Sequence, residues 1–399
     1  MKNWEVKTLG DIGKVSMCKR VFKEDTLPTG DIPFYKIGTF GKEPNAYITK
    51  ERYDEFRRKF SFPKKGDILI SASGTIGRCV RYDGEPAYFQ DSNIVWIDND
   101  EKNVLNSFLY RFYEVCNWGS TKGATIARLY NSNLKQIEIA YPKSLHEQQR
   151  IVAILDEAFA AIAKAKANAE QNLKNAKELF ESYLQDVFEN KGEGWEEKTL
   201  GGIYDVRDGT HDSPKYQEEG FPLITSKNLK KDLLNYDNVK YISEQDYINI
   251  NKRSKVDKGD ILFAMIGTIG NPVVIKDEPD FAIKNVALFK VPNSQNSNFL
   301  KYFLDAKSNI DKMMGDAKGT TQKFVGLGYL RAFKILLPPL KDQQIIVRKL
   351  DALSLETKKL EAIYQQKIND LEELKKSVLQ KAFAGELKEN LKEHYAENA

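Results

Sequence analysis

The sequence predicts an α+β protein made of two similar mixed α/β domains, separated by two long antiparallel coiled-coil helices and related as a pseudo-two-fold tandem repeat. Three observations predict this fold class. The segment "WEVKTLGDIGKV", which begins at Trp4, is repeated with few changes as "WEEKTLGGIYDV", which begins at Trp195. Each copy contains short apolar runs between turn residues, which is typical of strands. Each copy is followed by a long polar segment in which apolar residues recur every seven positions, as in coiled coils.

The repeat extends over nearly the whole chain and sets the domain boundaries. Offsets between matching residues stay between 191 and 196, which indicates a tandem duplication with small loop changes. Three further pairs follow in the same order: "KGDILISASGTIG" from Lys65 with "KGDILFAMIGTIG" from Lys258, Lys122–Thr125 with Lys318–Thr321, and "LHEQQRIVAILD" from Leu145 with "LKDQQIIVRKLD" from Leu340. We expect a first domain, a central helix, a second domain, a C-terminal helix and a polar tail at residues 1–144, 145–190, 191–339, 340–389 and 390–399.

Apolar runs inside each domain indicate buried strands. The predicted strands are "DILISA" and "DILFAM" after Lys-Gly-Asp turns, "NIVWI" from Asn93, "NVALFKV" from Asn285, and the closing runs "LKQIEIAYP" and "LRAFKILLPP", which prolines stop. Two runs have the spacing of short amphipathic helices, "SFLYRFYEV" near Ser107 and "SNFLKYFLDA" near Ser297. We interpret the two "GTIG" sequences as tight backbone turns, since no phosphate-binding G-x-x-x-x-G-K-[ST] pattern is present.

The two polar segments contain neither Gly nor Pro from residue 145 to 189 and from 340 to 384. In the first, the heptad positions are Leu155, Ile162, Ala169, Ala176 and Tyr183. In the second they are Leu350, Thr357, Tyr364, Leu371 and Val378, with Leu353, Leu360 and Leu374 three residues on. Small side chains of the first helix can pack against large ones of the second, so these residues predict the inter-helix seam or a partner-binding face. Such a helix is about 67 Å long at about 1.5 Å per residue.

Composition bounds the class of protein. The chain has 399 residues, of which 41% are hydrophobic and 30% charged, and its net charge of +4 lies mainly in the two domains. No apolar run is long enough for a membrane span, and no secretion signal pattern opens the chain. The three cysteines lack CxxC spacing and the three histidines lie far apart, so we expect no metal site. These features predict a cytoplasmic protein with reduced thiols and no membrane contact.

Taken together, the motifs resemble those of the specificity subunit of a Type I restriction-modification system. The resemblance rests on the "W-x-x-K-T-L-G" openings, the "K-G-D-I-L…G-T-I-G" cores, "G-T-T-Q" at Gly319–Gln322, "P-P-L-K-D-Q-Q" at Pro338–Gln344 and "L-K-K-S-V-L-Q-K-A-F-A-G-E-L" at Leu374–Leu387. The first half differs in places, with "GATI" where the second has "GTTQ".

The resemblance implies that each domain is a target recognition domain for one half of a split sequence in double-stranded DNA. It implies that the helices set the spacing and dock two methyltransferase subunits, and that restriction/translocase subunits complete the enzyme. Methylation of adenine would use S-adenosylmethionine, and the other subunits would use ATP and Mg, while this chain binds no cofactor and has no catalytic centre. A spacer of six to eight base pairs needs about 20–27 Å between the two reading edges, which a rigid coiled coil can keep in phase.

Candidate DNA contacts are basic and amide side chains near groove or phosphate positions. In the first domain they are Lys19, Arg20, Arg57, Arg58, Lys59, Arg78, Arg81, Lys122, Thr125 and Arg128. In the second they are Arg207, His211, Lys215, Lys227, Asn228, Lys230, Lys231, Lys252, Arg253 and Lys255, joined through the resemblance by Thr320, Thr321, Gln322 and Lys323. For any one of these the alternative is a solvated surface charge. For His211, beside Asp208 and Asp212, it is turn chemistry.

Other functions stay open at this stage. A coiled-coil scaffold with two protein-binding heads explains the helices and the duplication, but not the matched "GTIG" and "GTTQ" loops. A specificity subunit of a methylation-only system, or of another system with a bipartite site, would have the same features. A nuclease or methyltransferase is disfavoured, because "NPV" at Asn271–Val273 is not the Asn-Pro-Pro-aromatic motif of adenine methyltransferases.

Overall fold

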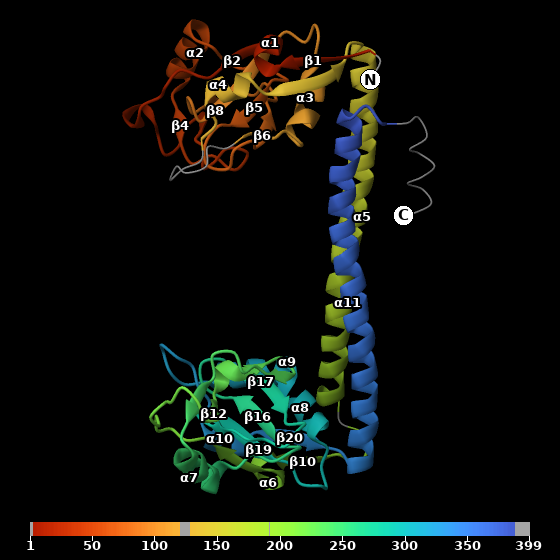
Figure 1. The fold of residues 1–399 in the computed structure, drawn as a ribbon. Helices are drawn as coiled ribbons and strands as arrows, with labels where there is room; N and C mark the ends of the chain where they lie inside the picture. Colours follow the sequence, from red (N-terminus) through yellow and green to blue (C-terminus); the bar gives the residue numbers. More distant parts are fainter. Residues whose placement is uncertain (1–2, 120–127, 191, 388–399) are drawn as a thin grey trace. The chain divides into compact units, whose positions relative to one another are not determined.

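The computed structural model describes residues 3–119, 128–190 and 192–387. The chain forms two compact units (Figure 1). Unit 1 contains residues 1–169 and 366–399, and unit 2 contains residues 170–365. We call residues 1–144 head 1 and residues 191–339 head 2. Each unit therefore combines one head with the adjoining halves of two long helices, rather than dividing the chain at the predicted domain boundaries.

Head 1 is built from short strands and helices. Its elements are β1 (Trp4–Thr8), α1 (Leu9–Ile12), β2 (Gly13–Ser16), η1 (Lys23–Asp25), β3 (Ile32–Tyr35), β4 (Tyr47–Ile48), α2 (Lys50–Lys59), β5 (Ile68–Ser71), β6 (Cys79–Arg81), β7 (Tyr88–Phe89), β8 (Ile94–Asn99), α3 (Asn106–Tyr113), α4 (Asn131–Lys135) and β9 (Glu138–Pro142). In the described part of head 1, the strands pair in the orders β2-β8-β5-β6, β4-β3-β7 and β1-β9.

Head 2 repeats this plan. Its elements are β10 (Glu196–Thr199), α6 (Leu200–Ile203), β11 (Asp205–Asp208), β12 (Phe221–Ile224), η2 (Ser226–Asn228), β13 (Leu229–Lys230), β14 (Leu233–Leu234), β15 (Lys240–Ile242), α7 (Glu244–Ser254), β16 (Ile261–Ala264), β17 (Gly270–Val274), β18 (Ala282–Ile283), β19 (Val286–Lys290), α8 (Ser297–Asp305), α9 (Lys307–Asp316), α10 (Leu327–Ala332) and β20 (Lys334–Leu337). The orders β11-β19-β16-β17, β15-β12-β18 and β10-β20 match those of head 1, and the hairpin β13-β14 is added. The predicted duplication is confirmed at the level of sheet topology.

The predicted strands and short helices fall where the sequence placed them. "DILISA" and "DILFAM" form β5 and β16, "NIVWI" and "NVALFKV" form β8 and β19, and the two closing runs form β9 and β20. The helical runs near Ser107 and Ser297 form α3 and α8. The antiparallel pairing of β1 with β9 and of β10 with β20 joins the start of each head to its end.

The central strand β5 is buried on both faces, which explains its continuous apolar run. Ile68 and Ile70 point into a core shared with α3 and the long helices. Leu69, between them, points into the opposite core with Trp96 and the three-stranded sheet. Successive strand residues alternate between faces, so a sheet covered on both sides needs apolar residues at every position. In head 2, β16 is likewise divided between two cores.

The two long helices are α5 (Leu145–Glu189) and α11 (Leu340–Phe383). In unit 1, the first half of α5 packs with the last half of α11, since Phe159 and Ile162 share a core with Val378 and Leu379. In unit 2, the last half of α5 packs with the first half of α11: Leu184 and Phe188 share a core with Val347 and Leu350. The start of one helix meets the end of the other in both units, so the pairing is antiparallel (Figure 1).

Burial follows the predicted seam closely. Leu155, Ile162, Ala169, Ala176, Leu350, Thr357 and Val378 are buried, and Tyr183, Tyr364, Leu371, Leu353 and Leu374 are half-buried. Leu360 was expected beside the seam, but 38% of its surface is exposed, so that prediction is wrong. Leu353 and Leu374 hold the same heptad position and are half-buried, so the exposure of Leu360 is local to its turn of α11. No helix in the described residues has the length and apolarity needed to cross a bilayer.

Candidate nucleic-acid interface

The two repeated loops of head 2 lie against each other. Gly267, in the second "GTIG" turn, has φ of +78° and donates its backbone N–H to the carbonyl oxygen of Lys323 at 2.8 Å. Lys318 and Phe324 exchange two backbone hydrogen bonds of 2.9 Å, which make "GTTQ" the tip of a tight hairpin. A Cβ at Gly267 would stand 2.9 Å from Nε2 of Gln322. The positive φ favours glycine at position 267, and its missing side chain lets the amide of Gln322 lie close to the turn.

Head 1 has the same anchoring of the corresponding loop. Leu129 donates its backbone N–H to the carbonyl oxygen of Ala72 at 2.8 Å, as Val325 does to Met265 at 3.0 Å. Arg128 forms a bridge with Ser73, and its side chain is exposed. Two predicted contacts in this loop, Lys122 and Thr125, lie outside the described residues.

A groove of about 790 Å³ lies beside the "GTTQ" hairpin of head 2. It is bordered by η2 and β13, by the turn before β15, and by the hairpin tip. Its lining residues are Tyr216, Leu223, Thr225, Ser226, Lys227, Asn228, Lys230, Asn235, Asp237, Asn238, Lys240, Ile266, Asn285 and Gln322. The structure thus brings together four of the predicted contacts from two separate parts of the sequence, namely Lys227, Asn228, Lys230 and Gln322.

Some polar side chains of the groove hold the fold. Asn228 is buried, and its Oδ1 accepts hydrogen bonds from the backbone N–H and the hydroxyl of Thr225, both at 2.9 Å. Its Nδ2 donates to the carbonyl oxygen of Asn235 at 2.9 Å. Asn235 in turn is bonded to Asp237. Asn228 was predicted as a DNA contact, but these three bonds give its side chain a role in shaping the wall of the groove.

Other groove side chains are exposed and have no internal partner. Within the described residues, Lys227, Lys230, Lys240, Asn238 and Gln322 make no side-chain hydrogen bond or ion pair. Three ammonium groups and two amides are therefore available to a ligand. Lys240 and Asn238 were not among the predicted contacts. The only local signal for them is the run of turn residues "NYDN" before the short strand β15.

His211 lies next to the groove and is held on both ring nitrogens. Nδ1 lies 2.9 Å from Oδ1 of Asn285, a groove residue, and Nε2 lies 2.9 Å from Oδ2 of Asp208. The buried carboxylate of Asp208 also forms an ion pair with Arg253. A proton on Nε2 is donated to the carboxylate of Asp208, and Nδ1 is then an acceptor that requires the amide N–H of Asn285 to face it. His211 and Arg253 therefore both contact Asp208 and hold the turn after β11. This corresponds to the structural role in a turn that was the alternative for His211.

The other predicted contacts of head 2 are exposed or half-buried, and several have partners. Arg207 pairs with Asp205 at 2.5 Å and Lys255 with Asp257 at 3.3 Å. Lys252 donates to Asn249, and Lys323 donates to the carbonyl oxygen of Met314. Four more are exposed without a side-chain hydrogen bond or ion pair within the described part of the chain: Lys215, Lys231, Thr320 and Thr321.

In head 1, most predicted contacts are engaged with the head itself. Arg20 pairs with Asp91 at 2.9 Å and Lys59 with Glu55 at 3.0 Å. The guanidinium of Arg78 donates to the carbonyl oxygen of Phe40 at 2.9 Å, which holds a loop of the fold. Arg58 donates a hydrogen bond to the carbonyl oxygen of Asp54. Two others make cation–π contacts: Lys19 lies over the ring of Phe60, and Arg57 lies over the rings of Tyr53 and Phe62. Arg81 is exposed at the end of β6.

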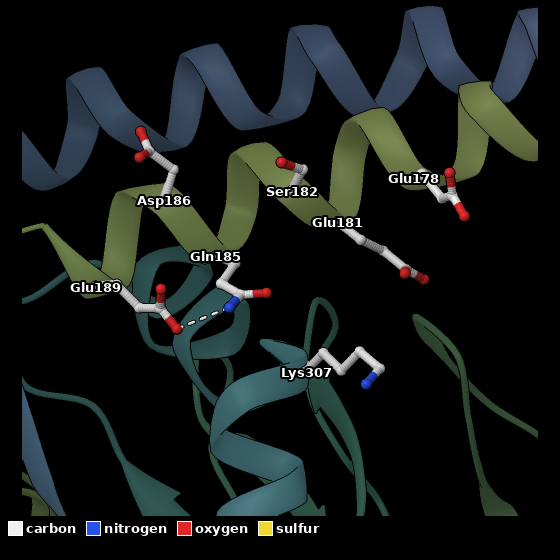
Figure 2. A pocket seen from close by; sticks show the side chains of 7 residues that line it. All are labelled: Glu178, Glu181, Ser182, Gln185, Asp186, Glu189 and Lys307. Carbon is white, nitrogen blue, oxygen red and sulfur yellow. Dashed lines mark hydrogen bonds between the residues drawn. The ribbon is translucent and has the colours of Figure 1, made fainter.

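A second surface feature of unit 2 has the opposite charge. A pocket of about 430 Å³ lies along the last turns of α5, and its lining includes Glu178, Glu181 and Glu189 of α5 and Lys307 of α9 (Figure 2). Gln185 donates a hydrogen bond to Glu189 at 2.8 Å. An acidic wall repels phosphates, so we do not assign DNA to this pocket. The described residues contain no group of His, Cys, Asp or Glu side chains that could hold a metal ion.

Comparison with known proteins gives the family. The model of the Type I restriction modification DNA specificity domain matches twice, over residues 1–174 and 192–373. The chain belongs to this family. The two matches coincide with the two copies found in the sequence, and the groove lies inside the second match. The chain is a specificity subunit of a Type I restriction-modification system, as the motifs indicated.

Curated relatives agree with this assignment, and solved structures share the fold. A putative type I restriction enzyme specificity subunit of Haemophilus influenzae is 63% identical over 38% of this chain and 40% of its own length. The MjaIX specificity subunit of Methanocaldococcus jannaschii is 25% identical over 97% of this chain and 94% of its own. The HsdS subunit of Thermoanaerobacter tengcongensis has a similar fold, with a TM-score of 0.63 and 17% identity over 97% of this chain and 98% of that one. A chain from a structure on assembly of a type I R-M system has a TM-score of 0.76 and 18% identity, over 97% of this chain and 99% of that one.

Proposed function

We propose that this specificity subunit binds a bipartite target in double-stranded DNA, with each head recognising one half-site. The observation that supports this most directly is the duplicated head, in which the sheets have the same strand order and Leu129 and Val325 are anchored on Ala72 and Met265 in the same way. Head 2 contains a groove whose lysine and amide groups have no side-chain partner among the described residues, the chemistry that phosphates and base edges require. Recognition of two separated half-sites needs two such readers on one chain.

We further propose that the subunit is non-catalytic and acts as the scaffold of the complex. Two methyltransferase subunits would dock on it, and restriction/translocase subunits would complete the nuclease. S-adenosylmethionine, ATP and Mg would then act in those subunits, in the cytoplasm where the chromosome lies. The absence of any catalytic motif in the sequence supports this division of labour.

The long helices are the proposed spacer between half-sites. Antiparallel packing in each unit buries Leu155 and Ile162 at one end of α5, and Leu184 and Phe188 at the other. A paired helix resists bending far better than a flexible linker, so it can fix both the distance and the rotational phase of two half-sites.

The test is to express the full chain with its methyltransferase subunit and map the methylated adenines across the host genome. A motif of two short specified parts, separated by a constant number of unspecified base pairs, is expected. Exchange of residues 191–339 for the second domain of a related subunit should change one half and leave the other intact. A single uninterrupted motif, or methylation that is independent of this chain, would contradict the proposal.

A further inference from the structure

We infer that the groove of head 2 is the surface that recognises one half-site. In it, Lys227, Lys230 and Lys240 contact phosphates, while Asn238 and Gln322 contact base edges. The inference rests on the proposed DNA binding by head 2 and adds which surface and which side chains carry it. No domain match or similarity to a relative assigns these positions.

The charge of the groove favours a polyanion. Its lining includes three lysines and a single acidic residue, Asp237. The carboxylate of Asp237 already accepts a hydrogen bond from Asn235 at 3.1 Å, so it is partly occupied within the turn. The three lysines are exposed and have no carboxylate partner in the described residues. A lysine that is not neutralised internally can replace a counterion on DNA, and the release of that counterion drives binding.

The free amides favour contacts to bases. An amide carries a donor and an acceptor side by side, and this pair matches N7 and N6 of adenine in the major groove. Gln322 and Asn238 are the two groove amides with no side-chain hydrogen bond among the described residues. Asn228 and Asn235, by contrast, are bonded within the turn. The groove therefore separates into amides that shape it and amides that are available to a ligand.

Both free amides sit on restrained backbone. Gln322 is at the hairpin closed by Lys318 and Phe324 and anchored on Gly267. Asn238 has φ of +57° in a turn closed by a 3.1 Å bond from Val239 N–H to the carbonyl oxygen of Tyr236. Side chains held on ordered turns lose less entropy on binding than those on mobile loops, so each contact can contribute more to specificity.

A small ligand fits this lining less well than a strand of DNA. Sites for small molecules are mostly apolar and bury most of the ligand. Here the lysines and both free amides are exposed, and the apolar lining is limited to Leu223 and Ile266 beside Tyr216. Exposed polar groups along a groove suit a ligand that extends beyond it, such as a duplex.

The first experiment tests base recognition. The full chain is assembled with its methyltransferase subunit, the wild-type motif is read from genomic methylation, and binding is measured to duplexes with single base-pair changes in each half-site. Gln322→Ala and Asn238→Gly are each expected to lose roughly 5- to 150-fold of discrimination at one position of one half-site. Glycine is chosen at position 238 because it accepts the positive φ. Asn293→Ala, at an exposed amide of the same head outside the groove, should leave all positions unchanged.

The second experiment tests the lysines through the salt dependence of binding. Each of Lys227→Ala, Lys230→Ala and Lys240→Ala should lower the slope of log K against log salt by about 1, with no change in base preference. Lys276→Ala, at an exposed lysine of head 2 away from the groove, is the control and should keep the wild-type slope. Thermal unfolding of every variant verifies that the exposed substitutions leave the fold intact.

The results separate this inference from the proposed function. If the wild-type complex binds and methylates a bipartite motif but the five groove variants behave like the two controls, the groove assignment is wrong and the proposed function stands. If the wild-type complex shows no bipartite target, the proposed function itself fails. A different result is that a free nucleotide displaces the DNA by binding in the groove, and that this effect is lost in the groove variants. That result would also overturn the assignment, in favour of a small-ligand site.

Discussion

Gln148, at the start of α5, accepts a hydrogen bond through Oε1 from the backbone N–H of Leu105 at 2.9 Å. Its Nε2 donates to the carbonyl oxygens of Asn103 and Pro142, both at 2.8 Å. Gln343, at the start of α11, has the same arrangement with Asn296 and Pro338, and both glutamines are fully buried. One amide in each repeat thus ties a long helix to its head.

Loss of either amide should weaken the joint between head and helix. Gln148→Leu removes the buried bond to the Pro142 carbonyl oxygen and the part-buried bonds to Leu105 and Asn103. Gln343→Leu removes the corresponding bonds to Asn296 and Pro338 in unit 2. We expect each to lower the free energy of unfolding of its unit by about 2–4 kcal/mol. The adjacent exposed glutamines provide matched controls, since Gln149→Leu and Gln344→Leu should change stability by less than about 0.5 kcal/mol. Equal effects from buried and exposed positions in urea unfolding would refute this account.

Ala169 tests how closely the helices pack. It is 2% exposed at a heptad position of α5, whereas Ala167, two residues earlier on the same helix, is exposed. Ala169→Leu inserts three carbon atoms into a packed seam and should cost about 1–3 kcal/mol. Ala167→Leu makes the same change on the solvent side and should be nearly neutral. Thermal unfolding of the two variants decides the matter, and no difference between them would mean that the seam at this position is loose.

Lys290 neutralises a buried carboxylate in head 2. Asp260, of the repeated "KGD" turn, is 3% exposed and forms an ion pair with Lys290, which also pairs with Asp257 at 2.5 Å. Lys290→Met keeps the aliphatic bulk but leaves Asp260 without its cation. Breaking a buried pair in this way should cost about 3 kcal/mol. The double variant with Asp260→Asn should recover part of that loss, because no buried charge then remains. A double variant less stable than Lys290→Met would argue against the pairing as the cause.

Asp67 occupies the same turn in head 1 but forms no ion pair within the described residues, and its burial should appear as a pH dependence. It is 2% exposed and bonded to the backbone N–H of Lys64 at 2.8 Å and to Asn106 at 3.2 Å. Burial raises the pKa of Asp67 above its ordinary value, despite the bond from Lys64. The folded protein therefore takes up this proton more readily than the unfolded chain does. The resulting stability is fully present below the ordinary pKa of about 4 and is lost as pH rises through the folded-state value.

The measurement is the difference in unfolding free energy between the wild type and Asp67→Asn as a function of pH. Other titrating groups cancel in this difference. The wild type should lose stability relative to the variant as the pH rises above about 4, the ordinary pKa of the carboxyl group. A difference that stays constant as the pH rises, or that moves in the opposite direction, would show that burial does not control Asp67.

Much of the fold could be predicted because its signals are local or repeated. The heptads that place Ile162 and Ala169 on one face need only the period of a helix, and the run that forms β5 needs only the length and apolarity of a buried strand. Because "KGDIL" occurs in both halves, a strand predicted in one copy supports the strand predicted at the same place in the other copy. The exception, Leu360, shares its heptad position with the half-buried Leu353 and Leu374, so the period alone does not give its exposure.

The sequence by itself determined that one α/β unit occurs twice, that two long helices carry a paired apolar seam, and that the chain resembles a DNA specificity subunit. Only the tertiary structure decided which polar groups are free. It placed Gln322 in the same groove as Lys227 and Lys240, engaged Arg20 and Arg253 in ion pairs, and buried Gln148 at the joint between head and helix. The physical reason is that periodicity is a property of neighbouring residues. Whether a charge faces a partner or the solvent depends instead on contacts between segments far apart in the chain.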